Sequence, residues 1–194
     1  MSGETEHFQA AIDKFDAANA QDPTLVVGTP AELVYARRMA DWLHRLYPDA
    51  DEALQLAARA QHIRRWMIPR SRYPMTRAGY HQWRTTLYTF HADEAAKILR
   101  EVGYDDAKID RVRSLLRKEK LKGDPQTQAL EDVACLVFLE NYFADFALKH
   151  DEQKVIDILR RTWRKMSDRG RAAALNLPLP AQARRLVESA LNSG

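Results

Sequence analysis

The chain has 194 residues, of which 45% are hydrophobic and 29% are charged, and its formal net charge is +3. This length suits one domain with a substantial core, and the composition excludes a wholly disordered protein. A single cysteine, Cys135, excludes an internal disulfide and a cysteine-rich zinc site. A pI of about 9.0 permits anionic partners but is too mild to identify a nucleic-acid-binding protein.

The start of the chain, Met1 to Glu6, is acidic and lacks the apolar stretch of a secretory signal peptide. No apolar run approaches the roughly 18 residues that a membrane-spanning helix requires. We therefore expect a cytoplasmic protein that has no membrane partner.

Apolar residues recur at three- and four-residue spacing along nearly the whole chain, and alternating strand patterns are absent. This pattern predicts an all-α protein, a single-domain bundle of many helices over residues 1–194. In chain order, the first expected helix ends before Asp22, the second runs from Thr29-Pro30 to about Tyr47, and the third from Asp49 or Asp51 to before Pro69. The fourth covers roughly 76–101, the fifth starts at Asp105, and the sixth runs from Asp124 to about His150. The seventh covers about 152–167, and a C-terminal helix follows Pro180.

Three details of these helices are also predicted. Thr29 is expected to cap the second helix, because Pro30 suits the first helical position and Glu32 suits the reciprocal capping role. The fourth helix is expected to break near His91. The sixth helix passes through the most apolar stretch of the chain, which favours a central position.

Forty consecutive residues, Ala53 to Ala92, contain no aspartate or glutamate. A uniform distribution of the 27 acidic residues would place about five or six in such a window, so chance explains the gap poorly. The window also lacks lysine but contains seven arginines: Arg59, Arg64, Arg65, Arg70, Arg72, Arg77 and Arg84. This segment predicts an anion-binding site.

Arginine is informative here because its planar guanidinium binds phosphate or carboxylate oxygens in pairs and stacks on aromatic rings. Rings that can stack on a nucleobase are interleaved with the arginines, namely Trp66, Tyr73, Tyr80, Trp83, Tyr88 and Phe90. The alternative is that the arginines pair with acids from distant helices while the rings belong to the core. The candidate phosphate-binding residues are Arg64, Arg65, Arg70, Arg77, Arg84 and, further along the chain, Lys118.

Two histidines and a pair of carboxylates are candidates for metal binding or proton transfer. His62 and His91 each stand beside small or apolar helical residues, and Glu131-Asp132 opens the most apolar helix. At least one of these carboxylates is expected to be buried, and a buried carboxylate needs a partner. His62, His91 and Asp132 are therefore candidate ligands of a divalent metal. The alternative is that Asp132 pairs with an arginine and both histidines are ordinary hydrogen-bonded groups.

The order of these residues resembles that of a known superfamily. Leu56 to Ile63 looks like a helix that ends in a His-Asp pair, His91 to Leu99 like a later histidine-led helix, and Leu130 to Ala134 like a final aspartate helix. This layout is similar to that of the HD-domain phosphohydrolases, which are all-helical, metal-dependent enzymes. The resemblance implies an HD-like core over about residues 30–150, followed by C-terminal helices over 151–194.

The departures from the HD pattern fall on its chemical positions. Tyr35 stands about where the first histidine would be, Gln61-His62 replaces the His-Asp pair, and Lys118 lies near the place of a second-metal histidine. The resemblance therefore implies a metal site that is either remodelled or lost.

A second resemblance covers nearly the whole chain. It rests on the run from Gln61 to Trp66, on Tyr73-Pro74, Gly79-Tyr80 and Trp83-Arg84, on Glu131 to Glu140, and on Lys165-Met166-Ser167. These residues resemble a family of uncharacterised bacterial and fungal proteins, a domain of unknown function, some members of which carry a glutamyl-tRNA-synthetase label. Lys165-Met166-Ser167 resembles part of the ATP-loop signature of that enzyme class. The chain lacks the glycine- and strand-rich nucleotide fold of those enzymes, so the label predicts no synthetase activity.

Three functions remain open from the sequence, and the third of them is a purely structural or partner-binding role. The first is a divergent HD-like phosphohydrolase acting on a small phosphorylated molecule, such as a nucleotide, with the metal on His62, His91 and Asp132 and with Glu131 moving a proton. The second is a non-catalytic helical module that binds a nucleotide, RNA or an acidic partner through the same arginines and rings.

Overall fold

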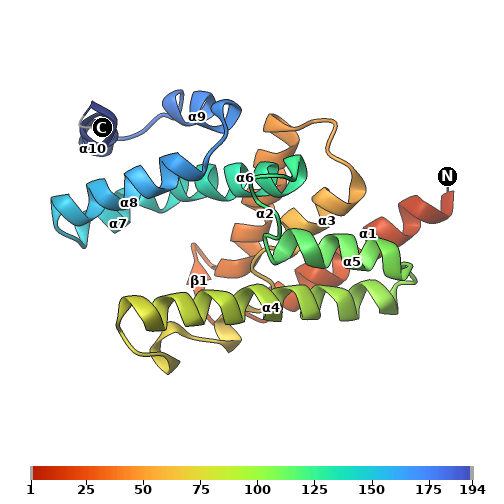
Figure 1. The fold of residues 1–194 in the computed structure, drawn as a ribbon. Helices are drawn as coiled ribbons and strands as arrows, with labels where there is room; N and C mark the ends of the chain where they lie inside the picture. Colours follow the sequence, from red (N-terminus) through yellow and green to blue (C-terminus); the bar gives the residue numbers. More distant parts are fainter. Residues whose placement is uncertain (1, 193–194) are drawn as a thin grey trace. The chain divides into compact units, whose positions relative to one another are not determined.

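The computed structural model describes residues 2–192, a range that leaves out Met1 at the acidic start of the chain. This part contains ten α-helices, two short 3-10 helices and one two-stranded sheet (Figure 1). The prediction of an all-α protein is confirmed, apart from this small sheet. The chain divides into two compact units, residues 1–127 and 128–194. No helix within the described range is both long enough and apolar enough to cross a lipid bilayer.

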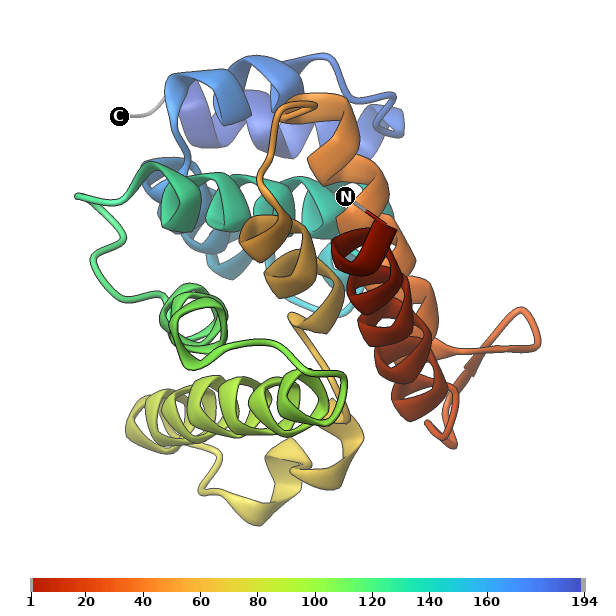
Figure 2. The ribbon, with the colours of Figure 1, turned by 90° about the vertical axis from the view of Figure 1, so that its right-hand side faces the viewer.

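The elements of the first unit follow one another with short connections. They are α1 (Ser2–Asn19), β1 (Leu25–Val26), β2 (Thr29–Pro30), α2 (Ala31–Leu46), α3 (Glu52–Ala60), η1 (Arg65–Met67), η2 (Arg70–Arg72), α4 (Arg77–Glu101), α5 (Asp106–Leu116) and the first residues of α6 (Pro125–Asn141). Helices α4 and α5 pack side by side, and α3 packs on α1, α2 and α5 (Figures 1 and 2). Their shared core is formed by fully buried apolar side chains: Phe15, Met39, Leu43, Leu56, Ile63, Leu99, Ile109 and Leu115.

Three of the predicted helix starts in this unit are confirmed by side-chain caps. Asp51 accepts a hydrogen bond from the backbone N–H of Leu54, Thr76 caps α4 and Asp105 caps α5 in the same manner. Such caps are readable from sequence because only a few short polar side chains can satisfy the unpaired N–H groups of a first turn. The predicted break near His91 is wrong, since α4 is continuous from Arg77 to Glu101.

The predicted cap of α2 is also wrong. Thr29 and Pro30 form β2, which pairs with β1 across a turn at Val27 and Gly28, where both residues have positive φ. The buried carboxylate of Asp22 replaces Thr29 as the cap and accepts from the backbone N–H of Glu32 at 3.0 Å and of Thr24 at 2.9 Å. The hairpin escaped prediction because strands of two residues are too short to show an alternating pattern.

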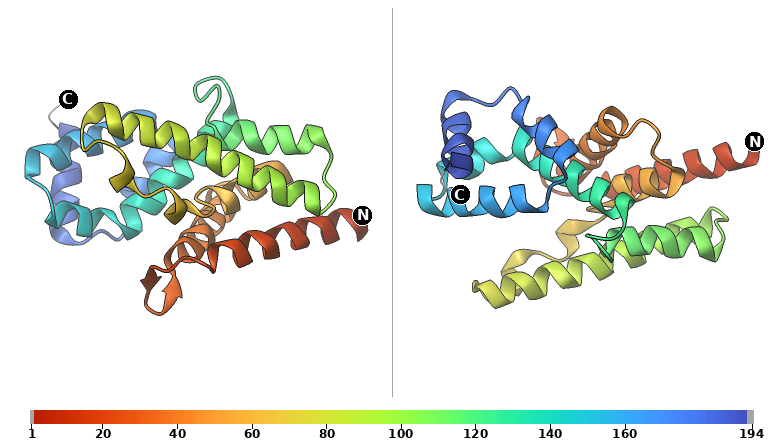
Figure 3. Two further views of the ribbon diagram at one scale, coloured as in Figure 1. Left: turned by 90° about the horizontal axis from the view of Figure 1, so that it is seen from below. Right: turned by 45° about the horizontal axis from the view of Figure 1, so that its top comes forward.

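The connection from α3 to α4 is irregular over residues 70–75, as predicted, and it lies beside the start of α4 (Figure 3). The expected extension of the third helix to Pro69 is wrong, since α3 ends at Ala60 and the connection begins at Gln61. Arg70 organises this segment, because its guanidinium donates to the carbonyl oxygens of Tyr73 at 2.9 Å and of Pro74 at 2.7 Å. The segment then passes so close to Gly79 that a Cβ at this position would meet the carbonyl oxygen of Pro74.

The second unit consists of the rest of α6, α7 (Phe143–Leu148), α8 (Glu152–Lys165), α9 (Asp168–Leu175) and α10 (Ala181–Asn192). The sixth predicted helix is interrupted at Tyr142, where φ is −127°. Helix α9 was not predicted, because eight residues between a serine cap and a proline-rich stretch give too short a periodic signal.

Candidate anion-binding site

Five residues of the first unit form a compact group that we call the His62 cluster: Glu32, Tyr35, His62, Arg65 and His91. Helix α2 supplies the first two, the turn after α3 supplies His62 and Arg65, and α4 supplies His91. The rings of Tyr35 and His62 are stacked, with centroids 3.8 Å apart, and the centroids of His62 and His91 are 5.8 Å apart.

The turn between α3 and η1 is held in an unusual backbone conformation. Arg64 has φ +51°, in the left-handed region that L-residues other than glycine, asparagine and aspartate seldom adopt. Two contacts hold it there: its backbone N–H donates to Oδ1 of Asn19 at 3.1 Å, and its guanidinium pairs with Glu94 at 2.9 Å. Because the turn is fixed on both sides, His62 and Arg65 are presented from a rigid backbone.

His91 is buried, with only 3% of its surface exposed. Its Nδ1 lies 2.9 Å from the carbonyl oxygen of Ile63, and a carbonyl only accepts, so Nδ1 carries the proton. The other ring nitrogen, Nε2, is then an acceptor, and it is buried without a hydrogen-bond partner among the described residues. Burial, together with the neighbouring His62, lowers the pKa of His91 to about 3, so the ring is neutral at pH 7.

Glu32 and His62 are in contact but do not form an ordinary ion pair. The Oε2 atom of Glu32 lies 3.4 Å from Nδ1 of His62, and its Oε1 lies 3.8 Å from the guanidinium of Arg65. Burial raises the pKa of the Glu32 carboxyl above its ordinary value, and Arg65 opposes this shift. Burial lowers the pKa of His62 well below its ordinary range, so the imidazole is neutral at pH 7.

Positive charge surrounds His62. After burial, the further causes that lower the pKa of His62 are the charges of Arg65, Lys118 and Arg84. These three cations are each placed against an aromatic ring, with Arg65 5.0 Å from the ring centre of Trp83 and Lys118 5.7 Å from that of Tyr88. Arg84 also donates to the hydroxyl of Tyr88. Within the His62 cluster, these positive charges face one carboxyl, that of Glu32, whose pKa is raised by burial.

The structure brings three of the six predicted phosphate-binding residues together around His62, namely Arg65, Arg84 and Lys118. The other three lie elsewhere or already have partners. Arg64 pairs with Glu94, Arg70 is bonded to backbone carbonyls of its own loop, and Arg77 is exposed on the first turn of α4. Arg59, also in the acid-free segment, is paired with Asp16 at 2.7 Å.

Asp132 and Glu131 belong to the second unit, where both are buried as the sequence predicts. Asp132 accepts from the backbone N–H of Ser167 at 2.8 Å, from the Ser167 hydroxyl, and from Gln128 at 3.0 Å. Ser167 in turn caps α9 by accepting from the N–H of Gly170. Glu131 lies 3.5 Å from the ammonium of Lys165. These contacts give Asp132 a structural partner in Ser167.

The predicted metal site can be compared with the metal-binding side chains that the structure places close together. Within residues 2–192, no three or more His, Cys, Asp or Glu side chains are arranged to hold a metal ion. The first unit does place two neutral histidines and one carboxyl, that of Glu32, close together. These donors fall short of the three or four convergent ligands of a metal site, and the predicted metal site stays a prediction.

Glu32 was not identified as a site residue from the sequence. Its position in the first turn of a helix matched a capping role, and that role explained it fully. Only the chain path of the α3–α4 turn brings His62 and Arg65 to its carboxylate, and no local pattern signals this contact.

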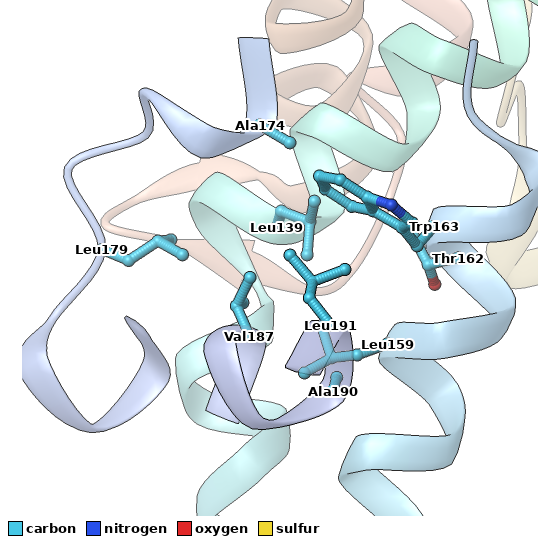
Figure 4. Close-up of a pocket in the computed structure, with 9 residues that line it drawn as sticks. All are labelled: Leu139, Leu159, Thr162, Trp163, Ala174, Leu179, Val187, Ala190 and Leu191. Carbon is cyan, nitrogen blue, oxygen red and sulfur yellow. The ribbon is translucent and has the colours of Figure 1, made fainter. Parts of the chain in front are cut away.

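The second unit contains a small apolar cavity of about 10 Å³. Side chains from α6, α8, the end of α9, the α9–α10 connection and α10 line it, among them Leu139, Trp163 and Leu179 (Figure 4). This volume is about that of a single water molecule, and the lining offers almost no polar groups. The cavity is therefore too small for a ligand larger than a water molecule.

Comparison with known proteins gives one result. A family model described as a domain of unknown function (DUF4202) matches residues 9–187. Neither the curated proteins nor the solved structures give a match. The family match covers nearly the whole chain, from the second turn of α1 into α10. The protein therefore belongs to the DUF4202 domain family.

Proposed function

We propose that the protein binds a small phosphorylated ligand at the His62 cluster, with Arg65, Arg84 and Lys118 as its phosphate-binding cations. The observation that carries this proposal is the placement of Arg65, Arg84 and Lys118 over two rings of α4, those of Trp83 and Tyr88, near the neutral His62. A phosphate group carries up to two negative charges and several acceptor oxygens, which guanidinium and ammonium groups satisfy directly.

The partial burial of the cluster supports the same function. The side chains of His62, Arg65 and Glu32 are 24%, 35% and 12% exposed, so these groups are reachable but largely shielded from water. Charge–charge attraction is stronger in such a setting than on an open surface. Arg65 is held only loosely by Glu32 at 3.8 Å, a distance that leaves its guanidinium available to a better acceptor.

Isothermal titration with inorganic phosphate and with a nucleoside monophosphate tests the proposal. Binding is expected to weaken about tenfold in Arg65→Ala and in Lys118→Gln, because each removes a charge-assisted contact. Arg37→Ala is the matched control, since Arg37 is an exposed arginine on α2. Equal binding by all three variants, or no binding by the unmodified protein, would overturn the proposal.

A divergent HD-type phosphohydrolase is the second candidate, and His91 favours it. A histidine whose Nδ1 donates to a backbone carbonyl presents its Nε2 as the ligand in many metal sites. Elemental analysis of the purified protein, with a phosphate-release assay in the presence of divalent metals, separates the two candidates. Bound metal and release of phosphate that is lost in His91→Gln would favour the enzyme. Ligand binding without metal or turnover would favour the binding module.

A further inference from the structure

Helix α4 carries a row of basic and aromatic side chains that extends beyond the His62 cluster. Arg77, Tyr80, Arg84 and Tyr88 follow one another at three- and four-residue spacing, which places them along one face of the helix. Lys118, over the ring of Tyr88, continues the row at its far end. We call these five residues the α4 stripe.

The α4 stripe runs beside the buried row of the same helix. The buried residues of this row are Gly79, Trp83, Leu87 and His91. The first three directly precede the stripe residues Tyr80, Arg84 and Tyr88, so the two rows run side by side along the helix. The stripe therefore leads from solvent at Arg77 to the level of His91, where the His62 cluster lies. Its outer residues are accessible, since Arg77 is exposed and Tyr80 is 41% exposed.

The length of the stripe exceeds the reach of one phosphate. Tyr88 lies eleven positions after Arg77, which corresponds to about 16 Å along a helix axis. One phosphate group bound by Arg65, Arg84 and Lys118 cannot also contact Arg77. A ligand that contacts the whole length of the α4 stripe therefore needs several phosphates in a row.

The rings of the stripe narrow the class of ligand further. Two guanidinium groups lie near the ring of Tyr80, with Arg70 6.0 Å and Arg84 5.9 Å from its ring centre. Stacked rings and guanidinium planes bind unpaired bases, whereas an acidic peptide or polyphosphate would use the cations alone. No aspartate or glutamate occurs between residues 53 and 92, so the α4 stripe has no carboxylate from its own helix turns to repel a polyanion.

We propose that the α4 stripe binds single-stranded nucleic acid, with Arg77, Arg84 and Lys118 on successive phosphates and Tyr80 stacked on a base. The inference rests on the proposed phosphate-binding function, because the inner end of the stripe shares Arg84 and Lys118 with it. It adds a polymeric ligand and the outer residues Arg77 and Tyr80.

Fluorescence anisotropy with labelled single strands of about 10 nucleotides, as RNA and as DNA, tests the inference at several salt concentrations. Affinity is expected to fall steeply as the salt concentration rises. Arg77→Ala is expected to reduce the slope of log affinity against log salt concentration by about 0.7, the contribution of one neutralised phosphate on a single strand. Tyr80→Ala is expected to weaken binding of the single strand about tenfold. Arg37→Ala is the control and should bind normally.

Titration with inorganic phosphate distinguishes the two proposals, because Arg77→Ala and Tyr80→Ala leave the three inner cations in place. Normal phosphate binding with loss of strand binding in these variants supports the α4 stripe. Strand binding no tighter than that of a mononucleotide overturns the inference and leaves the proposed function standing. Equal binding of duplex, polyphosphate or an acidic peptide also overturns it. Failure of every ligand, phosphate included, refutes both proposals.

Discussion

The imidazole of His62 lies flat against the phenol ring of Tyr35, with the ring centroids 3.8 Å apart and the planes inclined by only 9°. The stack joins α2 to the turn after α3 and leaves Nδ1 of His62 at the ring edge, 3.4 Å from the carboxyl oxygen of Glu32. The environment of this stack determines how the His62 cluster responds to changes in pH and in charge.

The two neutral histidines make stability depend on pH. The folded-state pKa of His91 is about 3 and that of an unfolded histidine is about 6.5, so the unfolded chain binds the extra proton between these values. Stability is therefore expected to fall as pH decreases through this window, by up to about 1.4 kcal/mol per pH unit for this group. Urea unfolding at pH 7, 6 and 5 measures the slope.

Carboxyl groups also titrate in the acidic part of this range, so the comparison that isolates the imidazole is with His91→Gln. Glutamine keeps a side-chain amide that can donate to the carbonyl of Ile63 but takes up no proton. The variant is expected to show a flatter pH dependence than the unmodified protein. Parallel curves would contradict the assigned protonation of His91.

Glu32→Gln tests the balance of charge in the His62 cluster. The carboxylate competes with an incoming anion for Arg65, which lies 3.8 Å away. Removing its charge is expected to tighten phosphate binding about fivefold, as measured by isothermal titration. Asp41→Asn, an exposed position on the same helix, should leave the affinity unchanged. Weaker binding by Glu32→Gln would assign the carboxylate a direct role in holding the ligand.

The Asp132–Ser167 contact is expected to stabilise the second unit. Ser167→Ala removes both the α9 cap and a hydrogen bond to a buried carboxylate, with an expected cost of about 2 kcal/mol in the free energy of unfolding. Gly170→Ala should also destabilise, because a Cβ there would lie 2.7 Å from the carboxylate of Asp132. Thermal unfolding measures both. Ser189→Ala, an exposed serine on α10, gives the comparison for a serine outside this contact.

Gly79→Ala is expected to displace the α3–α4 connection. The new methyl group would meet the carbonyl oxygen of Pro74, and relieving the overlap should cost about 1–3 kcal/mol. Faster hydrogen exchange or proteolysis within residues 69–76 would report the displacement. Ala78→Gly is the control, since it changes helix propensity by about 1 kcal/mol without touching the loop. Unchanged exchange in Gly79→Ala would contradict the close approach.

Much of the fold follows from local signals. Asp51, Thr76 and Asp105 begin helices where predicted, because capping is decided within four residues. Asp22 could not be identified as the cap of α2, since it reaches Glu32 only after the hairpin folds back. The same limit applies to the site. The acid-free segment pointed to Arg65 and Arg84, whereas their meeting with Glu32 and Lys118 depends on how distant helices pack.

The indole of Trp83 contacts both the α3–α4 connection and the proposed site. Its N–H donates to the carbonyl of Ile68 at 2.8 Å, and the guanidinium of Arg65 lies over its ring. The protein thus carries a native fluorophore in contact with a cation of the proposed site. Any ligand that draws the guanidinium of Arg65 away from the indole changes the electric field at Trp83. Emission from this tryptophan gives an optical readout of occupancy without a label, once the signals of Trp42, Trp66 and Trp163 are subtracted with a Trp83→Phe variant.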